Sequence, residues 1–107
     1  MNYSRAQIVA TIGPASKEKD IIRKMIDHQM DLARLNFSWG NQEDHIEFIA
    51  NIRAAAKDAG RRIPIIQDLS GPRIQKEGGH EINPEAEKVI TQKDIEDLKF
   101  GIEKGVE

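Results

Sequence analysis

Short apolar segments alternate with segments of helical periodicity along most of the chain, and this alternation constrains the fold more than any other feature of the sequence. Residues 7–12, 31–38 and 62–69 are apolar segments of strand length, and a turn signal containing glycine follows each of them. They predict three β-strands, the first of them buried. Parallel strands need a long crossover connection, which the intervening helices provide, so the pattern predicts a parallel sheet in an α/β protein.

Three segments with helical spacing accompany the strands. The first, residues 17–28, follows Ser16 as its expected N-cap, and the second, residues 42–59, stops at Gly60, which suits the left-handed position after a helix. The third follows Thr91, which with the aspartate three residues later predicts a capping box. Apolar residues recur at helical spacing at Ile22, Met25, Ile26, Ile46, Ile49, Ile52, Ala56, Ile95, Leu98 and Ile102.

The remaining segments bear on domain organisation. Residues 75–90 are polar and contain paired glycines and an Asn-Pro step, so we expect a loop or short linker there. The sequence ends at Glu107, where the alternation predicts a fourth strand. Three strands and three helices cover the faces of a parallel sheet poorly. Residues 1–107 are therefore expected to be an incomplete domain, either of an open sheet or of an eight-stranded barrel of about 250 residues.

Composition excludes several classes of function. Sixteen basic and eighteen acidic residues give a net charge of -2 and are mixed along the chain, which argues against nucleic acid or a membrane surface as the main partner. Because the chain has no cysteine, it holds no disulfide, thiolate zinc site or cysteine nucleophile. His28, His45 and His80 are too far apart to share a helical metal-binding face, and we expect surface histidines. The sequence shows no signal peptide or membrane span, so a cytoplasmic protein is expected.

The second strand carries polar residues on one face. Side chains alternate across a strand, so Arg34, Asn36 and Ser38 share one face, while the apolar residues between them share the other. An arginine inside a sheet is costly unless an anion neutralises it, and its fork of donors fits a carboxylate or a phosphate. Two interpretations stay open: Arg34 binds an anionic ligand at the carboxyl end of the sheet, or it pairs with Asp68 at the end of the next strand. Thr11, Gly13 and Ser16, at the end of the first strand, are further candidates for phosphate contact, with helix capping as the alternative role of Ser16.

Four segments resemble parts of one enzyme family, pyruvate kinase, in the family's order. They read Val-Ala-Thr-Ile-Gly-Pro-Ala-Ser at residues 9–16, Ala-Arg-Leu-Asn-Phe-Ser at 33–38, Asp-Leu-Ser-Gly-Pro at 68–72 and Glu-Asp-Leu-Lys-Phe-Gly-Ile at 96–102. The resemblance covers nearly the whole chain except residues 76–89, and four ordered motifs are far more specific than any one of them. It implies an α/β fold, a partial (β/α)8 TIM barrel with its first three parallel strands and three helices.

The resemblance also implies an activity and a set of site residues. Pyruvate kinases transfer the phosphoryl group of phosphoenolpyruvate to ADP, giving pyruvate and ATP. By this resemblance, Arg34 is expected to contact the substrate phosphate. The residues expected to bind nucleotide are Asn36, Phe37, Ser38 and Trp39. The residues expected to surround a potassium ion are Asn36, Ser38, Asp68 and, through its backbone carbonyl, Leu69. The magnesium ligands and the catalytic lysine of the family belong to later strands, so no catalytic residue is expected in this chain.

The sequence departs from the family at several positions. Trp39 stands where the family usually has a histidine near the nucleotide, and it either stacks on the base or packs against the protein. Gln75 replaces an arginine that commonly contacts nucleotide phosphate. Arg73 stands where potassium-dependent members tend to have glutamate and potassium-independent members lysine, so its charge either substitutes for the ion or faces solvent. Residues 75–90 stand in place of the family's inserted lid domain.

Two functions are compatible with these features. In the first, the chain is the N-terminal part of a larger enzyme that acts on phosphoenolpyruvate and ADP or ATP with Mg²⁺ and K⁺. In the second, it is a catalytically inactive fragment or small domain that keeps part of the phosphate and cation site. Unpaired strand edges and an uncovered apolar face favour self-association, or association with the remaining barrel segment.

Overall fold

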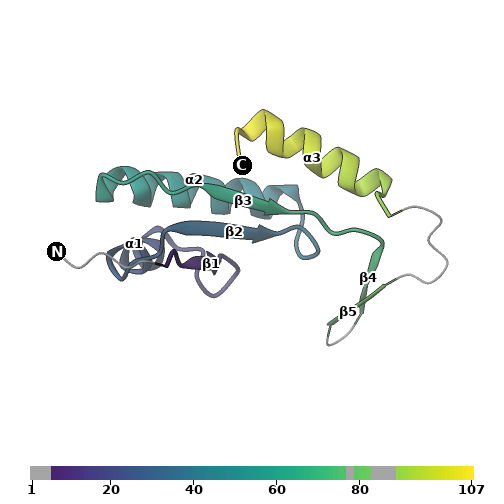
Figure 1. The fold of residues 1–107 in the computed structure, drawn as a ribbon, viewed down its shortest axis with the longest axis horizontal. Coiled ribbons are helices and arrows are strands. Elements are labelled where there is room, and N and C mark those ends of the chain that lie inside the picture. Colours follow the sequence, from purple (N-terminus) through teal and green to yellow (C-terminus); the bar gives the residue numbers. More distant parts are fainter. Residues whose placement is uncertain (1–5, 77–78, 83–88) are drawn as a thin grey trace.

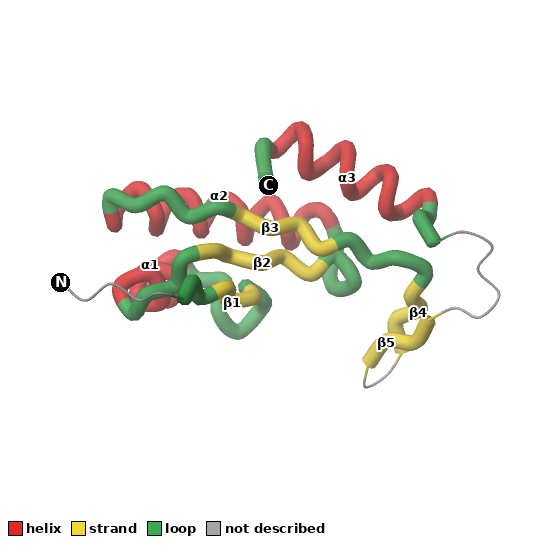
Figure 2. Tube along the Cα trace, viewed as in Figure 1, coloured by secondary structure: helices red, strands yellow, loops and turns green. Residues whose placement is uncertain are grey.

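The order of helices and strands follows the alternation in the sequence. A computed structural model describes residues 6–76, 79–82 and 89–107. The helices and strands are β1 (Val9–Thr11), α1 (Lys19–Asp27), β2 (Leu32–Asn36), α2 (Gln42–Ala59), β3 (Ile65–Asp68), β4 (Arg73–Lys76), β5 (Gly79–Ile82) and α3 (Gln92–Lys104). Figure 1 and Figure 2 show the β-α-β-α-β run followed by the β4–β5 pair and α3. The predicted pattern is confirmed, although each of the three expected strands is shorter than predicted.

The first three strands form a sheet with a simple winding. β1, β2 and β3 are parallel and neighbour one another in that order. One face of β2 is buried against α1 and α2, whereas its other face is half-buried. Both crossover helices therefore lie on the same face of the sheet. A doubly wound sheet would place helices on both faces, so this single winding is the arrangement found in a (β/α)8 barrel.

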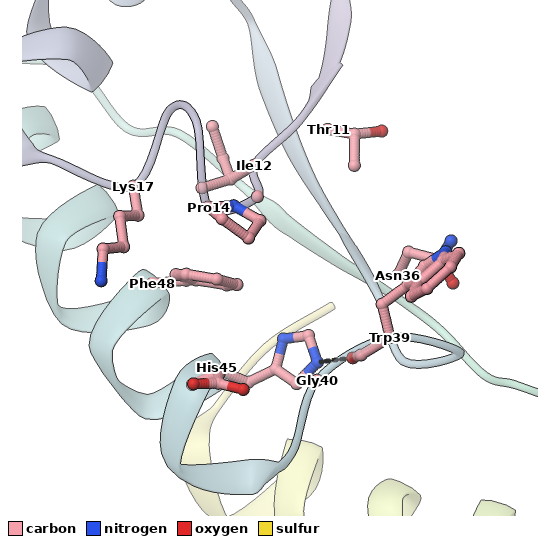
Figure 3. Close-up of a pocket in the computed structure, with 11 residues that line it drawn as sticks. Thr11, Ile12, Pro14, Lys17, Asn36, Trp39, Gly40, His45 and Phe48 are labelled. Carbon is pink, nitrogen blue, oxygen red and sulfur yellow. Dashed lines mark hydrogen bonds between the residues drawn. The ribbon is translucent and has the colours of Figure 1, made fainter. Parts of the chain in front are cut away.

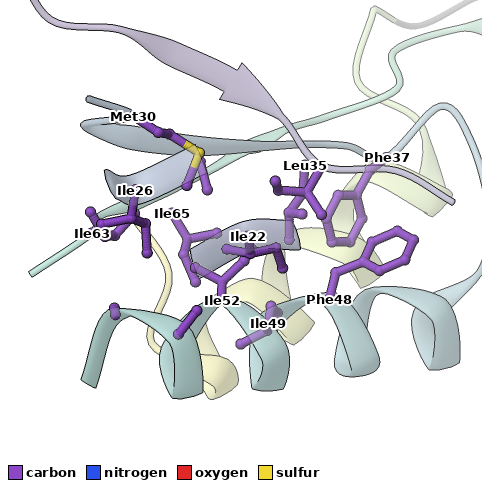
Figure 4. Close-up of a cluster of buried hydrophobic side chains, with 14 of the residues drawn as sticks. Ile22, Ile26, Met30, Leu35, Phe37, Phe48, Ile49, Ile52, Ile63 and Ile65 are labelled. Carbon is purple, nitrogen blue, oxygen red and sulfur yellow. The ribbon is translucent and has the colours of Figure 1, made fainter. Parts of the chain in front are cut away.

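The hydrophobic core lies between the sheet and these two helices (Figure 4). Ala33, Leu35 and Phe37 are buried and alternate with half-buried residues, which confirms the predicted apolar face of β2. The largest fully buried side chains are Ile22, Ile26, Leu35 and Ile52. The opposite face of the sheet, which carries Arg34, has no covering helix among the described residues, and we call it the open face.

This single-sided covering explains why β1 is not the buried strand that the sequence predicted. Val9 is 49 % exposed and the side chain of Thr11 is also exposed, whereas Ile12, just beyond the strand, is buried. The register pairs Val9 with Leu32 and Thr11 with Arg34, so these residues belong to the open face. β1 therefore packs against the core through one face only, and its apolar composition does not mean that both faces are buried.

The helix ends agree with the sequence except at the first helix. Ser16 is not an N-cap: its backbone N–H bonds to Gly13 O and its hydroxyl accepts from Gly13 N at 3.2 Å, which closes a turn before the helix begins. Glu18 occupies the N-cap position of α1 without a side-chain bond. Gly60 adopts the predicted left-handed conformation, with φ of 66°. The predicted capping box at Thr91 is confirmed.

The inward face of α2 differs from the predicted stripe at one position. Ile46 is 44 % exposed. Phe48 and His45 take the inward positions in that part of the helix, beside the expected Ile49 and Ile52. The prediction treated His45 as a polar surface residue, so it placed the adjacent Ile46 on the inward face instead.

The packing of α3 contradicts the predicted stripe. Ile95, Leu98 and Ile102 are exposed, and the buried residues are Asp94, Asp97, Phe100 and Gly101. Polar bonds dock this face: Gly71 N donates to Asp94 Oδ1 at 2.9 Å, and Gln67 Nε2 donates to the Asp97 carbonyl at 2.6 Å. Gly101 permits a close approach, since a Cβ there would lie 2.0 Å from the Gln67 side chain. Hydrogen bonding to the end of β3 therefore decides which face of α3 points inward.

Part of the predicted loop at residues 75–90 is regular structure. β4 and β5 form an antiparallel pair that extends away from the three-stranded sheet (Figure 1). The loop prediction was wrong for these strands, because paired backbone groups can stabilise a polar sequence without an apolar pattern. Residues 77–78 and 83–88 lie outside the described part of the chain.

The last residue lies beside the free edge of β3. Glu107 N donates to Ile65 O at 2.8 Å, and Gln67 N donates to Glu107 O at 3.3 Å. In a parallel sheet, a residue on one strand bonds through its N–H and its carbonyl to two residues of the neighbouring strand that are two positions apart. Glu107 makes this pair of bonds with Ile65 and Gln67. Val106 packs against the core. The backbone at Glu107 therefore occupies the place where the sequence predicts the next strand.

Candidate functional site

Arg34 lies at the centre of the polar cluster on the open face. Its Nε donates to Asp68 Oδ2 at 3.0 Å, its Nη2 donates to the same oxygen, and its Nη1 donates to Thr11 Oγ1 at 3.0 Å. The side chains of Arg34 and Asp68 are 35 % and 45 % exposed, so the guanidinium remains reachable from the open face. The ion pair that the sequence offered as one interpretation is present, and both of its side chains remain partly exposed to solvent.

Asn36 and Asp68 are direct neighbours at the carboxyl ends of β2 and β3. β2 ends at Asn36, so Ser38 lies in the following turn and strand alternation does not place it beside Arg34, contrary to the prediction. Asn36 Oδ1 accepts from Ser38 N at 3.0 Å, which ties the turn to the strand end. Leu69 follows Asp68 and is half-buried. Asn36 and Asp68 therefore lie at the same edge of the sheet, and Asp68 bonds directly to Arg34.

A cleft with a volume of about 560 Å³ opens at the carboxyl ends of β1 and β2 (Figure 3). Its lining residues come from both strand ends, the two turns and the first half of α2: Thr11, Ile12, Gly13, Pro14, Lys17, Asn36, Trp39, Gly40, Asp44, His45 and Phe48. Asn36 and Trp39 were predicted nucleotide-binding residues, and the structure brings both to this cleft. The side chain of Phe37 instead lies in the core, so only its backbone is available to a ligand there.

Sequence reasoning missed the contribution of α2 to the cleft. Asp44, His45 and Phe48 line it from the first turns of the helix, and Lys17 lines it from the loop before α1. Lys17 Nζ lies 3.5 Å from Glu47 Oε2. The strand pattern gives no signal for these residues, because a helix packed over the strand ends brings them to the site. Arg73 begins β4 with an exposed side chain.

His45 is a buried histidine, which corrects the prediction that it lies on the surface. The residue is 3 % exposed, and its ring stacks on Phe37 with centroids 3.9 Å apart and meets Phe48 edge-on. Nε2 lies 3.0 Å from Trp39 O. A carbonyl oxygen only accepts hydrogen bonds, so Nε2 carries the proton, and the buried Nδ1 has no partner within the described part of the chain. His28 is exposed as predicted, and the side chain of His80 is not described.

Burial lowers the pKa of His45 below its ordinary value of 6.5. The unfolded chain therefore takes up this proton before the folded chain does, and stability is expected to fall as pH is lowered through about 6.5, by at most about 1.4 kcal/mol per pH unit. Urea unfolding between about pH 8 and pH 5 measures this slope. His45→Phe keeps the ring stack and is expected to flatten the profile, while His28→Gln is expected to keep it. An unchanged slope in His45→Phe would contradict the assignment.

The described residues contain no group of three or more His, Cys, Asp or Glu side chains that could hold a metal ion. Within the same residues, no helix has the length and apolar character needed to cross a membrane. The candidate site consists of the polar residues Thr11, Arg34, Asn36 and Asp68 together with the cleft that Thr11 and Asn36 also line.

Comparison with known proteins identifies the family. The model of the pyruvate kinase barrel domain matches residues 3–88. The chain is 40 % identical over 95 residues to a pyruvate kinase of Geobacillus stearothermophilus, which covers 85 % of this chain and 16 % of the relative. It is 43 % identical over 96 residues to a pyruvate kinase of Thermococcus litoralis, which covers 86 % of this chain and 20 % of the relative. The chain thus spans a fifth or less of these two relatives. It belongs to the pyruvate kinase family, and it corresponds to part of the barrel domain.

Proposed function

We propose that this chain supplies one wall of the active site of a pyruvate kinase, which transfers a phosphoryl group from phosphoenolpyruvate to ADP. The observation that carries the proposal is the position of Arg34 on the open face, bonded to Asp68 and to Thr11, of which Thr11 also lines the cleft. Phosphoryl transfer depends chiefly on positioning and on neutralising negative charge. A half-exposed arginine with a fixed orientation can position the phosphate of the substrate and neutralise part of its negative charge.

The cleft beside Arg34 is the proposed nucleotide site. Its volume lies within the range of about 300–1,000 Å³ typical of small-molecule pockets, and its walls combine apolar rings with a few polar groups. Trp39, on the rim, is 44 % exposed and offers an aromatic face on which a base can stack. Asn36 lines the cleft and is also the neighbour of Asp68, which pairs with Arg34. Gln75 cannot supply the charge of the family's arginine, so we propose that Lys17, the cationic side chain in the lining of the cleft as described, faces the nucleotide phosphates.

We propose a monovalent cation site at the carboxyl ends of β2 and β3 and in the turn after β2. Asn36 Oδ1, the Asp68 carboxylate, the Ser38 hydroxyl and the Leu69 carbonyl are hard oxygen donors, which suit potassium. A bound potassium ion would add positive charge beside the transferred phosphate. Arg34 already neutralises part of the Asp68 charge. We propose that Arg73 replaces the ion, and that magnesium is held by residues outside this chain.

Pyruvate formation tests the proposal. The assay contains phosphoenolpyruvate, ADP and Mg²⁺, with either the 107-residue chain or an extended chain, in which these residues are joined to the part of the Geobacillus stearothermophilus relative that follows its matched segment. We expect turnover only in the extended chain, with little difference between potassium and sodium. An inactive extended chain that folds would refute the enzyme proposal, and activity rising many-fold with potassium would refute the role of Arg73.

A second candidate function is a non-catalytic domain that associates with itself or with the remaining barrel segment in the cytoplasm. The observation that favours it is the exposed row of Ile95, Leu98 and Ile102 on α3. An apolar row of this kind is typical of a helix that packs against a further element. Oligomerisation of the 107-residue chain, without activity in the extended chain, would favour this second function.

A further inference from the structure

Side chains from two different helices hold the turn that follows β2. This turn comprises residues 37–40 and carries Trp39 to the rim of the cleft. His45, on α2, donates from Nε2 to the Trp39 carbonyl at 3.0 Å. Lys93, on α3, donates from Nζ to the Phe37 carbonyl at 2.7 Å. The N–H groups of the turn already bond to the strand ends, Phe37 N to Asp68 O at 2.9 Å and Trp39 N to Asn36 O at 3.2 Å. The contacts from His45 and Lys93 add restraints at the carbonyl oxygens of the turn.

The ammonium group of Lys93 is itself held in place. It pairs with Asp97, one helical turn further along α3. Asp97 is 5 % exposed, and a carboxylate buried to that degree requires partners, which here are Lys93 and, at 3.5 Å, Gln42 Nε2. The Asp97 backbone carbonyl accepts from Gln67 Nε2, which anchors this part of the helix to β3. The ammonium group of Lys93 is therefore held in position where it bonds to the Phe37 carbonyl of the turn.

A small cavity lies behind the turn. Its volume is about 210 Å³, and its lining includes Phe37, Gly40, His45, Lys93 and Asp97. Gly40 and His45 also line the larger cleft, so the turn separates the two spaces. Lys93 also lines this cavity, and its bond to the Phe37 carbonyl fixes the separation between the turn and α3.

We propose that Lys93 and Asp97 are positioning residues, which act through the Phe37 carbonyl to hold Trp39 at the rim of the cleft. The consequence for ligand binding rests on the proposed function, in which Trp39 contacts the nucleotide. When only a fraction of the molecules carry the turn in its binding position, the apparent affinity falls by that fraction. Helix α3 thereby influences the shape of the cleft, although none of its residues is among those that line the cleft.

Fluorescence of Trp39 tests the proposal without any ligand, because the chain has one tryptophan. In Lys93→Met, the emission maximum is expected to move to longer wavelength and quenching by acrylamide to increase. Lys93→Arg is expected to restore the wild-type values, because a guanidinium can donate to both the Phe37 carbonyl and Asp97. Circular dichroism establishes that each variant is folded. Should Lys93→Met fail to fold, Asp97→Asn is expected to give the same direction of change at smaller amplitude.

Arg53→Met is the matched control. Arg53 donates from Nη2 to the Lys104 carbonyl, so it holds the other end of the same helix with the same kind of bond. We expect this variant to leave the fluorescence of Trp39 unchanged. An equal change in Arg53→Met would show that general docking of α3 matters, and would overturn the proposal. Wild-type quenching in a folded Lys93→Met would overturn it as well.

Titration with ADP separates this inference from the proposed function. The dissociation constant is expected to rise about fivefold in Lys93→Met and to stay unchanged in Arg53→Met. No binding by the wild type would contradict the nucleotide proposal, while the fluorescence of Trp39 still decides the positioning role. Equal affinity of the wild type and Lys93→Met would overturn the role of Lys93 in shaping the cleft for a ligand.

Discussion

Replacing Arg34 by methionine in the extended chain is expected to lower kcat/KM for phosphoenolpyruvate about a hundred- to a thousand-fold, as removal of one preorganised donor does at other sites of charge stabilisation. The methionine keeps the aliphatic stem and removes the guanidinium. The free energy of unfolding is expected to change by no more than about 1 kcal/mol, because the lost pair with Asp68 is partly exposed to solvent. Steady-state kinetics and urea unfolding of the same preparations measure the two effects.

The two measurements decide between the interpretations of Arg34 that the sequence left open. A large kinetic effect with a small stability effect indicates a ligand site, whereas a large stability effect with unchanged kinetics would indicate a purely structural ion pair. Arg23→Met is the matched control. Arg23 forms an exposed pair with Asp27 on α1, away from the cleft, and its replacement is expected to leave both quantities nearly unchanged.

Replacing Leu35 by alanine is expected to reduce the free energy of unfolding by about 2–5 kcal/mol, the range for a leucine removed from a well-packed core. Leu35 is fully buried in the centre of β2, between the sheet and the helices that cover it (Figure 4). Domains of this kind have total stabilities of about 5–15 kcal/mol, so the variant loses a large share of its stability. Equilibrium unfolding in urea, followed by circular dichroism, measures the loss.

Leu98→Ala is the control for this prediction, because it makes the same substitution on the outward face of α3. Leu98 is 47 % exposed, and its replacement is expected to change stability by less than about 0.5 kcal/mol. A loss as large as that of Leu35→Ala would mean that the apolar row of α3 is covered in solution. In that case the chain associates through this face, as the second candidate function requires.

Local sequence patterns were sufficient for the regular part of the fold. The alternation of apolar segments predicted the three parallel strands, and the alternation within β2 predicted which of its residues are buried. Gly60 and Thr91 marked helix ends correctly, because capping depends on bonds within a few residues. The same reasoning placed Arg34 and Asp68 together, since strand ends in a parallel sheet meet at one edge.

Features that depend on competition between alternative partners were not predictable in this way. Ser16 has the chemistry of an N-cap, but its hydroxyl accepts a bond from Gly13 instead. His45 is polar by composition, yet the stack with Phe37 and the bond to Trp39 O make its burial favourable. In each case, a partner that the local pattern does not reveal decides the outcome.

The family motifs, the parallel strands and the place of Arg34 on the polar face of β2 follow from residues that are near in sequence or opposite in register. The sequence by itself therefore determined the α/β class of the fold and the candidate polar face, whereas the single winding became visible only from the packing of α1 and α2. Tertiary structure alone decided that the carboxylates of α3 face inward and its isoleucines outward, because the Asp94 carboxylate accepts from Gly71 N and the Asp97 carboxylate accepts from Gln42 Nε2. It also decided the shape of the cleft. A cleft is the space between packed elements, and no periodicity within a single element specifies it.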